Sequence, residues 1–154
     1  MKKIEIDTFL KFRFLSNPHF SPDGTKIAFT VSVPDREANG YLSDLYLYDL
    51  GKKAVSRVTC GGDAKIWSWT AENTLIFTAA RTAAIKKEKE NGTSFFYEIS
   101  PSGGEASCRA SVPASVTGIR LLPDGRYLLT IRHDNYKDTR KKSYEVFDEL
   151  PFWG

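Results

Sequence analysis

The chain of 154 residues contains few of the residue types that build metal and catalytic sites. It has two cysteines and two histidines, and none of them shows the Cys-x-x-Cys or Cys/His spacing of a zinc site. We therefore predict that Cys60 and Cys108 are free thiols. The sequence also lacks the Gly-x-Ser-x-Gly elbow that exposes a nucleophilic serine. We predict no catalytic residue, no cofactor and no metal site in this chain.

The sequence also has no large excess of one charge sign and no long apolar run. The 22 basic and 19 acidic residues give a net charge of +3, which is too small an imbalance to favour nucleic acid as a partner. No segment approaches the roughly 18 consecutive apolar residues that a membrane helix needs. Residues Met1–Asp7 contain no hydrophobic signal region. These absences predict a cytoplasmic protein that binds neither nucleic acid nor a membrane.

What the sequence does contain is a repeat. Phe20–Gly24 reads FSPDG and precedes an alternating apolar segment, and Leu121–Gly125 reads LLPDG in the same context. A degenerate copy, WTAEN, occupies Trp69–Asn73. The copies begin at positions 20, 69 and 121, so the steps are 49 and 52 residues. One blade of a β-propeller takes roughly 40 to 50 residues, and the spacing therefore indicates a blade repeat.

The Pro-Asp-Gly sequence is typical of a tight turn between two strands. Proline presets φ for the second turn position, aspartate bonds to its own downstream backbone, and glycine accepts a positive φ. In the middle copy Asn73 replaces glycine and fits that conformation less well. We interpret Asp23 and Asp124 as turn residues, and neither as a ligand nor as a catalyst.

Turn signals between alternating segments divide each full repeat into four short strands. The fold class predicted is all-β: a partial β-propeller of four-stranded antiparallel blades, two complete and a third incomplete, with a short N-terminal helical arm. The expected divisions are the arm at 1–15, blade one at 16–64, blade two at 65–115 and incomplete blade three at 116–154. Asp7 is expected to cap the arm's helix, and Ser16–Pro18 to end it.

Several polar and basic segments have a structural and a functional interpretation. His19 lies beside a proline at an expected strand start and His133 lies in a charged loop, and no serine and acid are placed to make a triad around either. The acidic loop 134–138 fails the calcium-loop pattern. Lys86–Glu90 has mixed charge and favours a solvated loop or a single helical turn. Lys11–Phe14 alternates basic and aromatic residues, as in single-strand nucleic-acid binding, but core packing explains it with fewer assumptions.

Four segments together resemble a known family. They are Phe20–Phe29, Asp44–Leu50 (DLYLYDL), Phe96–Ala106 and Tyr144–Trp153 (YEVFDELPFW). In this order they resemble the N-terminal propeller of prolyl oligopeptidase-type serine peptidases (the S9 family), especially the acylaminoacyl-peptidase-like branch. The Pro-Asp-Gly motif by itself is also common to TolB-like (PD40) propellers.

The resemblance implies a propeller, usually of seven or eight blades, that covers a C-terminal α/β-hydrolase domain carrying a Ser, Asp and His triad. The chain is then expected to be a non-catalytic, inactive N-terminal fragment that gates substrate access. Its partners would be the remaining blades and the hydrolase domain, and exposed blade edges would favour self-association. The alternative is a TolB-like scaffold or protein-binding module without a peptidase domain.

Overall fold

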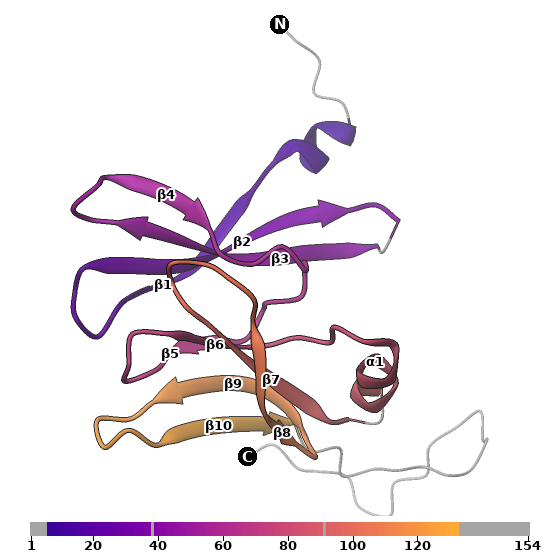
Figure 1. Cartoon of the computed structure of the whole chain (residues 1–154). Helices are drawn as coiled ribbons and strands as arrows, with labels where there is room; N and C mark the ends of the chain where they lie inside the picture. The colour runs from indigo at the N-terminus through magenta and orange to yellow at the C-terminus, as the bar shows by residue number, and fades with distance from the viewer. Residues whose placement is uncertain (1–5, 38, 91, 133–154) are drawn as a thin grey trace, which may run out of the picture.

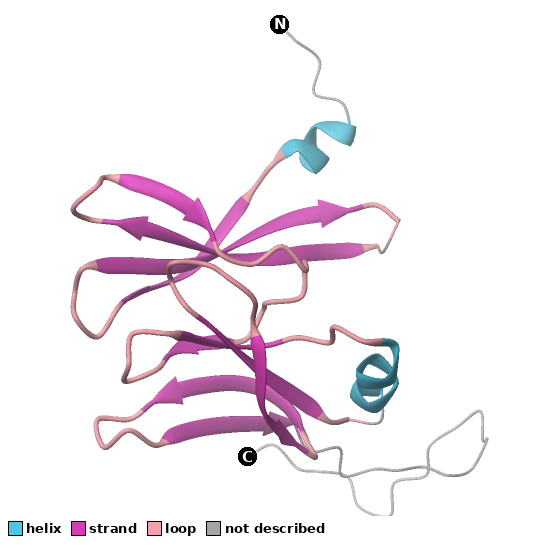
Figure 2. Ribbon diagram, viewed as in Figure 1, coloured by secondary structure: helices cyan, strands magenta, loops and turns pink. Residues whose placement is uncertain are grey.

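The computed structural model describes residues 6–132 except 38 and 91, and these residues form three antiparallel sheets (Figures 1 and 2). In Figure 1 the sheets follow one another from top to bottom in chain order. The first sheet has the order β1 (Phe14–Phe20), β2 (Lys26–Asp35), β3 (Gly40–Asp49), β4 (Ala54–Arg57). The second has the order β5 (Trp67–Trp69), β6 (Leu75–Thr78), β7 (Ser94–Ile99), β8 (Ser107–Val112). The third pairs β9 (Ser115–Leu121) with β10 (Tyr127–Arg132).

Each repeat motif forms the turn between the first two strands of a sheet, as predicted. Gly24 has φ 69° and Gly125 has φ 81°, while Asn73 takes the same left-handed conformation at φ 59°. Asp23 Oδ1 accepts hydrogen bonds from the Ser21 hydroxyl at 2.6 Å and from the Thr25 amide at 3.0 Å. These bonds lower the pKa of Asp23 from 3.8 to about 2. The aspartates therefore act as the turn residues that the sequence indicated.

The degenerate turn between β5 and β6 contacts the turn between β1 and β2. Asn73 Oδ1 accepts a hydrogen bond from the Asp23 amide at 3.1 Å, although the two residues are 50 positions apart. Glycine at position 73 would adopt the positive φ at a lower conformational cost, but it has no side chain to accept this bond. The asparagine thus closes its own turn and ties it to the neighbouring sheet.

The main core lies between the first and second sheets. Side chains that share one face of the first sheet meet the facing side chains of the second, and the fully or nearly buried members are Ala28, Leu45, Leu47, Trp67, Trp69, Leu75, Phe77, Tyr97 and Ile99. The alternation predicts this, because residues two apart along a strand share a face. Burial of these apolar side chains is the main force that holds the two sheets together.

A polar network fixes the segment that leads from β4 to β5. Asp44, on β3, is only 7% exposed. Its carboxylate accepts hydrogen bonds from the Thr59 hydroxyl (2.9 Å), the Gly62 amide (3.1 Å) and Arg57 Nη2 (2.6 Å). The hydrogen bond to Asp44 raises the pKa of Arg57 above its ordinary value. This network holds the connection against β3, where Ser43 and Asp63 form a short parallel bridge.

Three expectations need correction. Asp7 does not precede the helix as its cap but lies in the first turn of η1 (Ile6–Lys11), a short 3-10 helix. Ser16–Pro18 does not end a helix, because β1 already begins at Phe14 and runs through these residues. Asn17 takes φ 52° and Pro18 has no amide hydrogen, so the pairing with β2 shifts between Ser16 and His19 without ending the strand. The arm does pack on the first sheet, where the Phe9 ring lies 5.6 Å from Phe14.

The charged segment at Lys86–Glu90 is more regular than the loop or single helical turn that was expected. It belongs to an eight-residue helix, α1 (Ala83–Glu90). Thr82 precedes the helix, and its hydroxyl accepts a hydrogen bond from the Ile85 amide at 3.2 Å. Ile85 packs against the core while Lys86–Lys89 are exposed. A capping threonine and one apolar anchor therefore favour the helix over a loop.

One buried hydrogen bond between the first two sheets can be tested by a near-isosteric change. Trp67 Nε1 donates to the Thr30 hydroxyl at 2.9 Å, and Thr30 is 3% exposed. Thr30→Val should lower the free energy of unfolding by about 1–3 kcal/mol, because it leaves a buried indole N–H without an acceptor. Urea unfolding measures this. Thr117→Val, which removes an exposed hydroxyl bond on β9, is the control and should stay within about 0.5 kcal/mol. Equal effects of both variants would contradict the role given to Thr30.

The pKa of Asp23 predicts a dependence of stability on pH. Because the folded value of about 2 lies below the unfolded value of 3.8, the ionised turn stabilises the fold above pH 3.8. This contribution disappears as the pH falls from 3.8 through about 2. Asp23→Asn should therefore lower the melting temperature at pH 6. On acidification, the melting temperature of this variant should fall by less than that of the wild type. Glu105→Gln, at an exposed loop carboxylate, is the matched control. If the melting temperatures of the wild type and of Asp23→Asn fall by the same amount between pH 6 and pH 2, the assignment is refuted.

Candidate functional site

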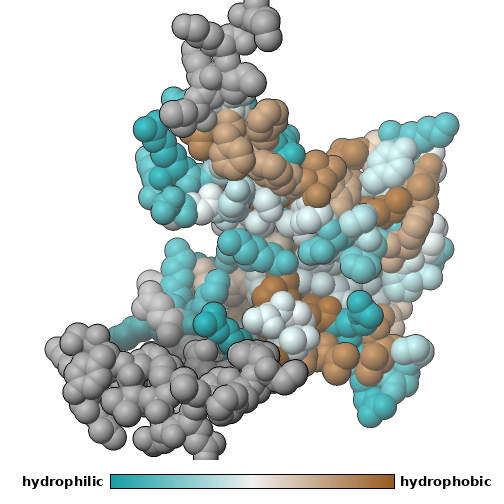
Figure 3. Space-filling view, turned by 180° about the vertical axis from the view of Figure 1, so that it is seen from behind, coloured by the Kyte–Doolittle hydropathy of each residue, from teal (hydrophilic) through white to brown (hydrophobic). Residues whose placement is uncertain are grey.

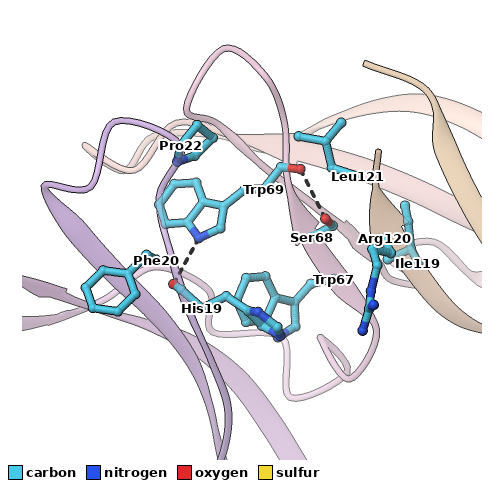
Figure 4. Close-up of a pocket in the computed structure, with 9 residues that line it drawn as sticks. All are labelled: His19, Phe20, Pro22, Trp67, Ser68, Trp69, Ile119, Arg120 and Leu121. Carbon is cyan, nitrogen blue, oxygen red and sulfur yellow. Dashed lines mark hydrogen bonds between the residues drawn. The ribbon is translucent and has the colours of Figure 1, made fainter. Parts of the chain in front are cut away.

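The described residues contain a cavity where the first strands of the three sheets approach one another. Its nine lining residues come from the end of β1 and the following turn, from the whole of β5 and from the end of β9: His19, Phe20, Pro22, Trp67, Ser68, Trp69, Ile119, Arg120 and Leu121 (Figure 4). The volume is about 370 Å³. Ligand pockets occupy roughly 300 to 1,000 Å³, so the cavity can hold a small molecule or one side chain.

The Trp-Ser-Trp sequence of β5 positions the aromatic wall. Alternation places Trp67 and Trp69 on the face that meets the first sheet and Ser68 on the opposite face. Trp69 Nε1 donates to the His19 carbonyl at 3.1 Å, and Trp67 is fixed by its bond to Thr30. The His19 ring contacts Trp67 edge-to-face at a centroid distance of 5.6 Å. Both indole rings are therefore held in fixed orientations before any ligand binds.

Arg120 gives the lining of the cavity a positive charge. None of the nine described lining residues is acidic. Figure 4 shows the Arg120 side chain extending beside Trp67 and His19, on the opposite side of the view from Phe20. Within residues 6–132, as far as the structure describes them, Arg120 takes part in none of the ion pairs, which join Arg36, Arg57, Arg109 and Arg126 to carboxylates. The guanidinium is available to an anionic group.

The cavity does not assemble a nucleophile and a base. The Ser68 hydroxyl donates to the Trp69 carbonyl at 3.1 Å, and no hydrogen bond joins it to His19 among the residues drawn in Figure 4. A serine needs an adjacent general base to act as a nucleophile at neutral pH. Among the described lining residues, Ser68 therefore has no adjacent general base.

The residues singled out in the sequence lie apart from one another. Asp23 and Asp124 occupy the turns of the first and third sheets, and His19 lies at the end of β1. Cys60 and Cys108 are free thiols, as predicted, and both are exposed. His133 and the acidic loop 134–138 fall outside the described residues. The sequence interpretation missed Trp67, Trp69 and Arg120; the alternating Trp-Ser-Trp was the signal for the first two.

The described part of the chain shows neither a metal-binding cluster nor a membrane-spanning helix. Between residues 6 and 132, with 38 and 91 left out, no three His, Cys, Asp or Glu side chains gather as they would to hold a metal ion. No helix in the described ranges has the length and apolar character needed to cross a membrane.

The fold and the sequence can be compared with known proteins. No protein-family profile matches the chain. It is 26% identical to the "Uncharacterized peptidase YuxL" of Bacillus subtilis (strain 168) over 155 aligned positions, which cover 94% of this chain and 22% of that protein. The chain thus spans about a fifth of the length of this curated relative.

Solved structures show the same fold. An acylaminoacyl peptidase solved in complex with Z-Gly-Gly-Phe-chloromethyl ketone matches over 96% of this chain and 21% of its own, with a TM-score of 0.62 and 18% identity. The acylaminoacyl peptidase of Pyrococcus horikoshii gives the same values. The β-propeller domain of the Trilobed protease from Pyrococcus furiosus matches over 79% of this chain and 34% of its own, with a TM-score of 0.56 and 16% identity.

These comparisons confirm the resemblance to the propeller part of S9-type peptidases and the predicted fold class. The described sheets are antiparallel, two of them are four-stranded, and a short 3-10 helix precedes them. The relatives are peptidase-related propellers, and this chain shares their blade architecture.

Proposed function

We propose that the chain is the non-catalytic propeller part of a serine peptidase, and that it gates the access of peptides to an α/β-hydrolase domain. The observation that carries this proposal is the fold match with an acylaminoacyl peptidase over 96% of the chain but only 21% of that peptidase. The sequence without a Gly-x-Ser-x-Gly elbow and the cavity without a nucleophile–base pair support a non-catalytic role. The exposed thiols of Cys60 and Cys108 suit a reducing, cytoplasmic location.

In this proposal the division stays as predicted from sequence, with an arm at 1–15, blades at 16–64 and 65–115 and the beginning of a third at 116–154, although β1 already begins at Phe14 and β9 at Ser115. Blades of a propeller surround a central channel. The seven residues of β1 are all exposed, which suits a strand that lines such a channel. Gating would then follow from the width of the channel, because a peptide must fit past the first strands to reach a hydrolase domain beneath them.

The exposed apolar face of the first sheet favours the proposal that further blades pack against this chain. Residues paired directly across strands share a face, so Leu15, Phe20 and Val55 lie with Val31, Ile27 and Tyr48 on the side opposite the main core. Leu15, Phe20 and Val55 are 68%, 64% and 59% exposed. Figure 3 shows apolar side chains in the upper part of the molecule, where the first sheet lies, as well as lower in the view. A neighbouring blade would cover this face, and without one a second copy would do so.

Activity of the chain by itself tests the non-catalytic role. A fluorophosphonate probe labels activated serines, and we expect no covalent labelling of the purified 154-residue chain. Mass spectrometry after incubation measures this, with an intact serine peptidase as the positive control. A labelled serine would overturn the proposal. A reading frame that continues from Gly154 into a Gly-x-Ser-x-Gly elbow would support the peptidase role, whereas further blades followed by a stop would favour a TolB-like scaffold.

Association through the exposed apolar face of the first sheet is tested by adding charge to it. The average mass in light scattering should rise with concentration for the wild type, and Val55→Lys should reduce this rise severalfold because a buried lysine would oppose the contact. Ser56→Lys is the matched control: Ser56 is the next residue on β4, is also exposed, and pairs with Leu47 on the other face. A wild-type chain that stays monomeric at all concentrations would contradict self-association.

A further inference from the structure

The cavity at the first strands combines an apolar wall with one free cation. Trp67, Trp69 and Pro22 supply flat apolar surfaces, and Phe20, which is 64% exposed, stands at one side. Aromatic side chains bury large areas, so they dominate the energetics of small apolar ligands. The wall therefore favours an occupant with an aryl or alkyl group.

The geometry of this wall is fixed by the fold. Trp67 and Trp69 are 7% and 5% exposed, and each indole N–H is already bonded, to Thr30 and to the His19 carbonyl. Neither ring needs to lose side-chain freedom when a ligand arrives. Preorganisation of this kind lowers the entropic cost of binding. The indole donors are also unavailable, so any charge on the ligand must be met by another group.

Arg120 is the group that can meet it. It lines the cavity from β9, and among the described residues no carboxylate pairs with it. By contrast, Arg126, on the same hairpin, pairs with Asp124 at 2.6 Å. A guanidinium presents two parallel N–H donors that match the two oxygens of a carboxylate. None of the nine lining residues that the structure describes is acidic, so none of their side chains repels an anion by its charge.

We propose that this cavity binds small apolar carboxylates. Arg120 holds the carboxylate, and the apolar part of the ligand lies against Trp67 and Trp69. The proposal rests on the residues that line the cavity and not on the peptidase relationship, so it stands or falls separately from the proposed function.

The test uses 3-phenylpropionate and its neutral analogue 3-phenylpropionamide with the 154-residue chain at neutral pH. The indole N–H signals in nitrogen-15 NMR report binding, and Trp67→Phe and Trp69→Phe assign two of the three indole signals. We expect saturable shifts of the Trp67 and Trp69 signals, with the carboxylate binding about tenfold more tightly than the amide. No saturable shift, or equal affinity for the two compounds, would overturn the proposal.

Arg120→Gln should weaken binding of the carboxylate about tenfold and leave binding of the amide unchanged. Arg126→Gln removes the same charge from the same hairpin outside the cavity, and it should change neither. If Arg126→Gln weakens carboxylate binding as much as Arg120→Gln does, the effect comes from the net charge of the chain and the proposed role of Arg120 is wrong. The comparison of acid and amide on the unmodified chain decides the proposal even if the Arg120 variant fails to fold.

Discussion

The packing of β5 against the first sheet is the constraint on which the rest of the structure depends. Its three residues place two indole rings in the main core, and each ring donates its N–H to the first sheet. An unpaired indole N–H would be costly to bury, so these bonds select one register between the sheets. The same rings then form the wall of the cavity. Stability of the sheet pair and the shape of the candidate site therefore have one origin.

Much of this architecture is local enough to be predicted from sequence. The turns at Asp23 and Asp124 follow from residues with one strong conformational preference each, and the strands follow from alternation. The structure corrected the sequence interpretation where two preferences compete. Pro18 suggested the end of an element, yet tertiary pairing with β2 carried the strand past it. In the same way, a capping Thr82 and a partly buried Ile85 outweighed the exposed charges of α1.

The candidate site could not be predicted because its parts are brought together only by the stacking of sheets. His19, Trp69 and Arg120 lie about fifty residues apart in sequence, and no motif relates an arginine on one first strand to a tryptophan on another. The repeat period places the three strands in equivalent positions. It does not say which of their side chains share a space, since this depends on the twist and separation of the sheets.

The bond from the Asp23 amide to Asn73 shows that the repeats are adapted to their neighbours. A Pro-Asp-Gly turn at this position of the second blade would lack the side-chain oxygen that accepts this bond. The asparagine is complementary to the turn beside it, so the bond adds to the contacts that favour this pair of neighbouring blades. A small loss of turn quality in the second blade thus contributes to the specificity of assembly.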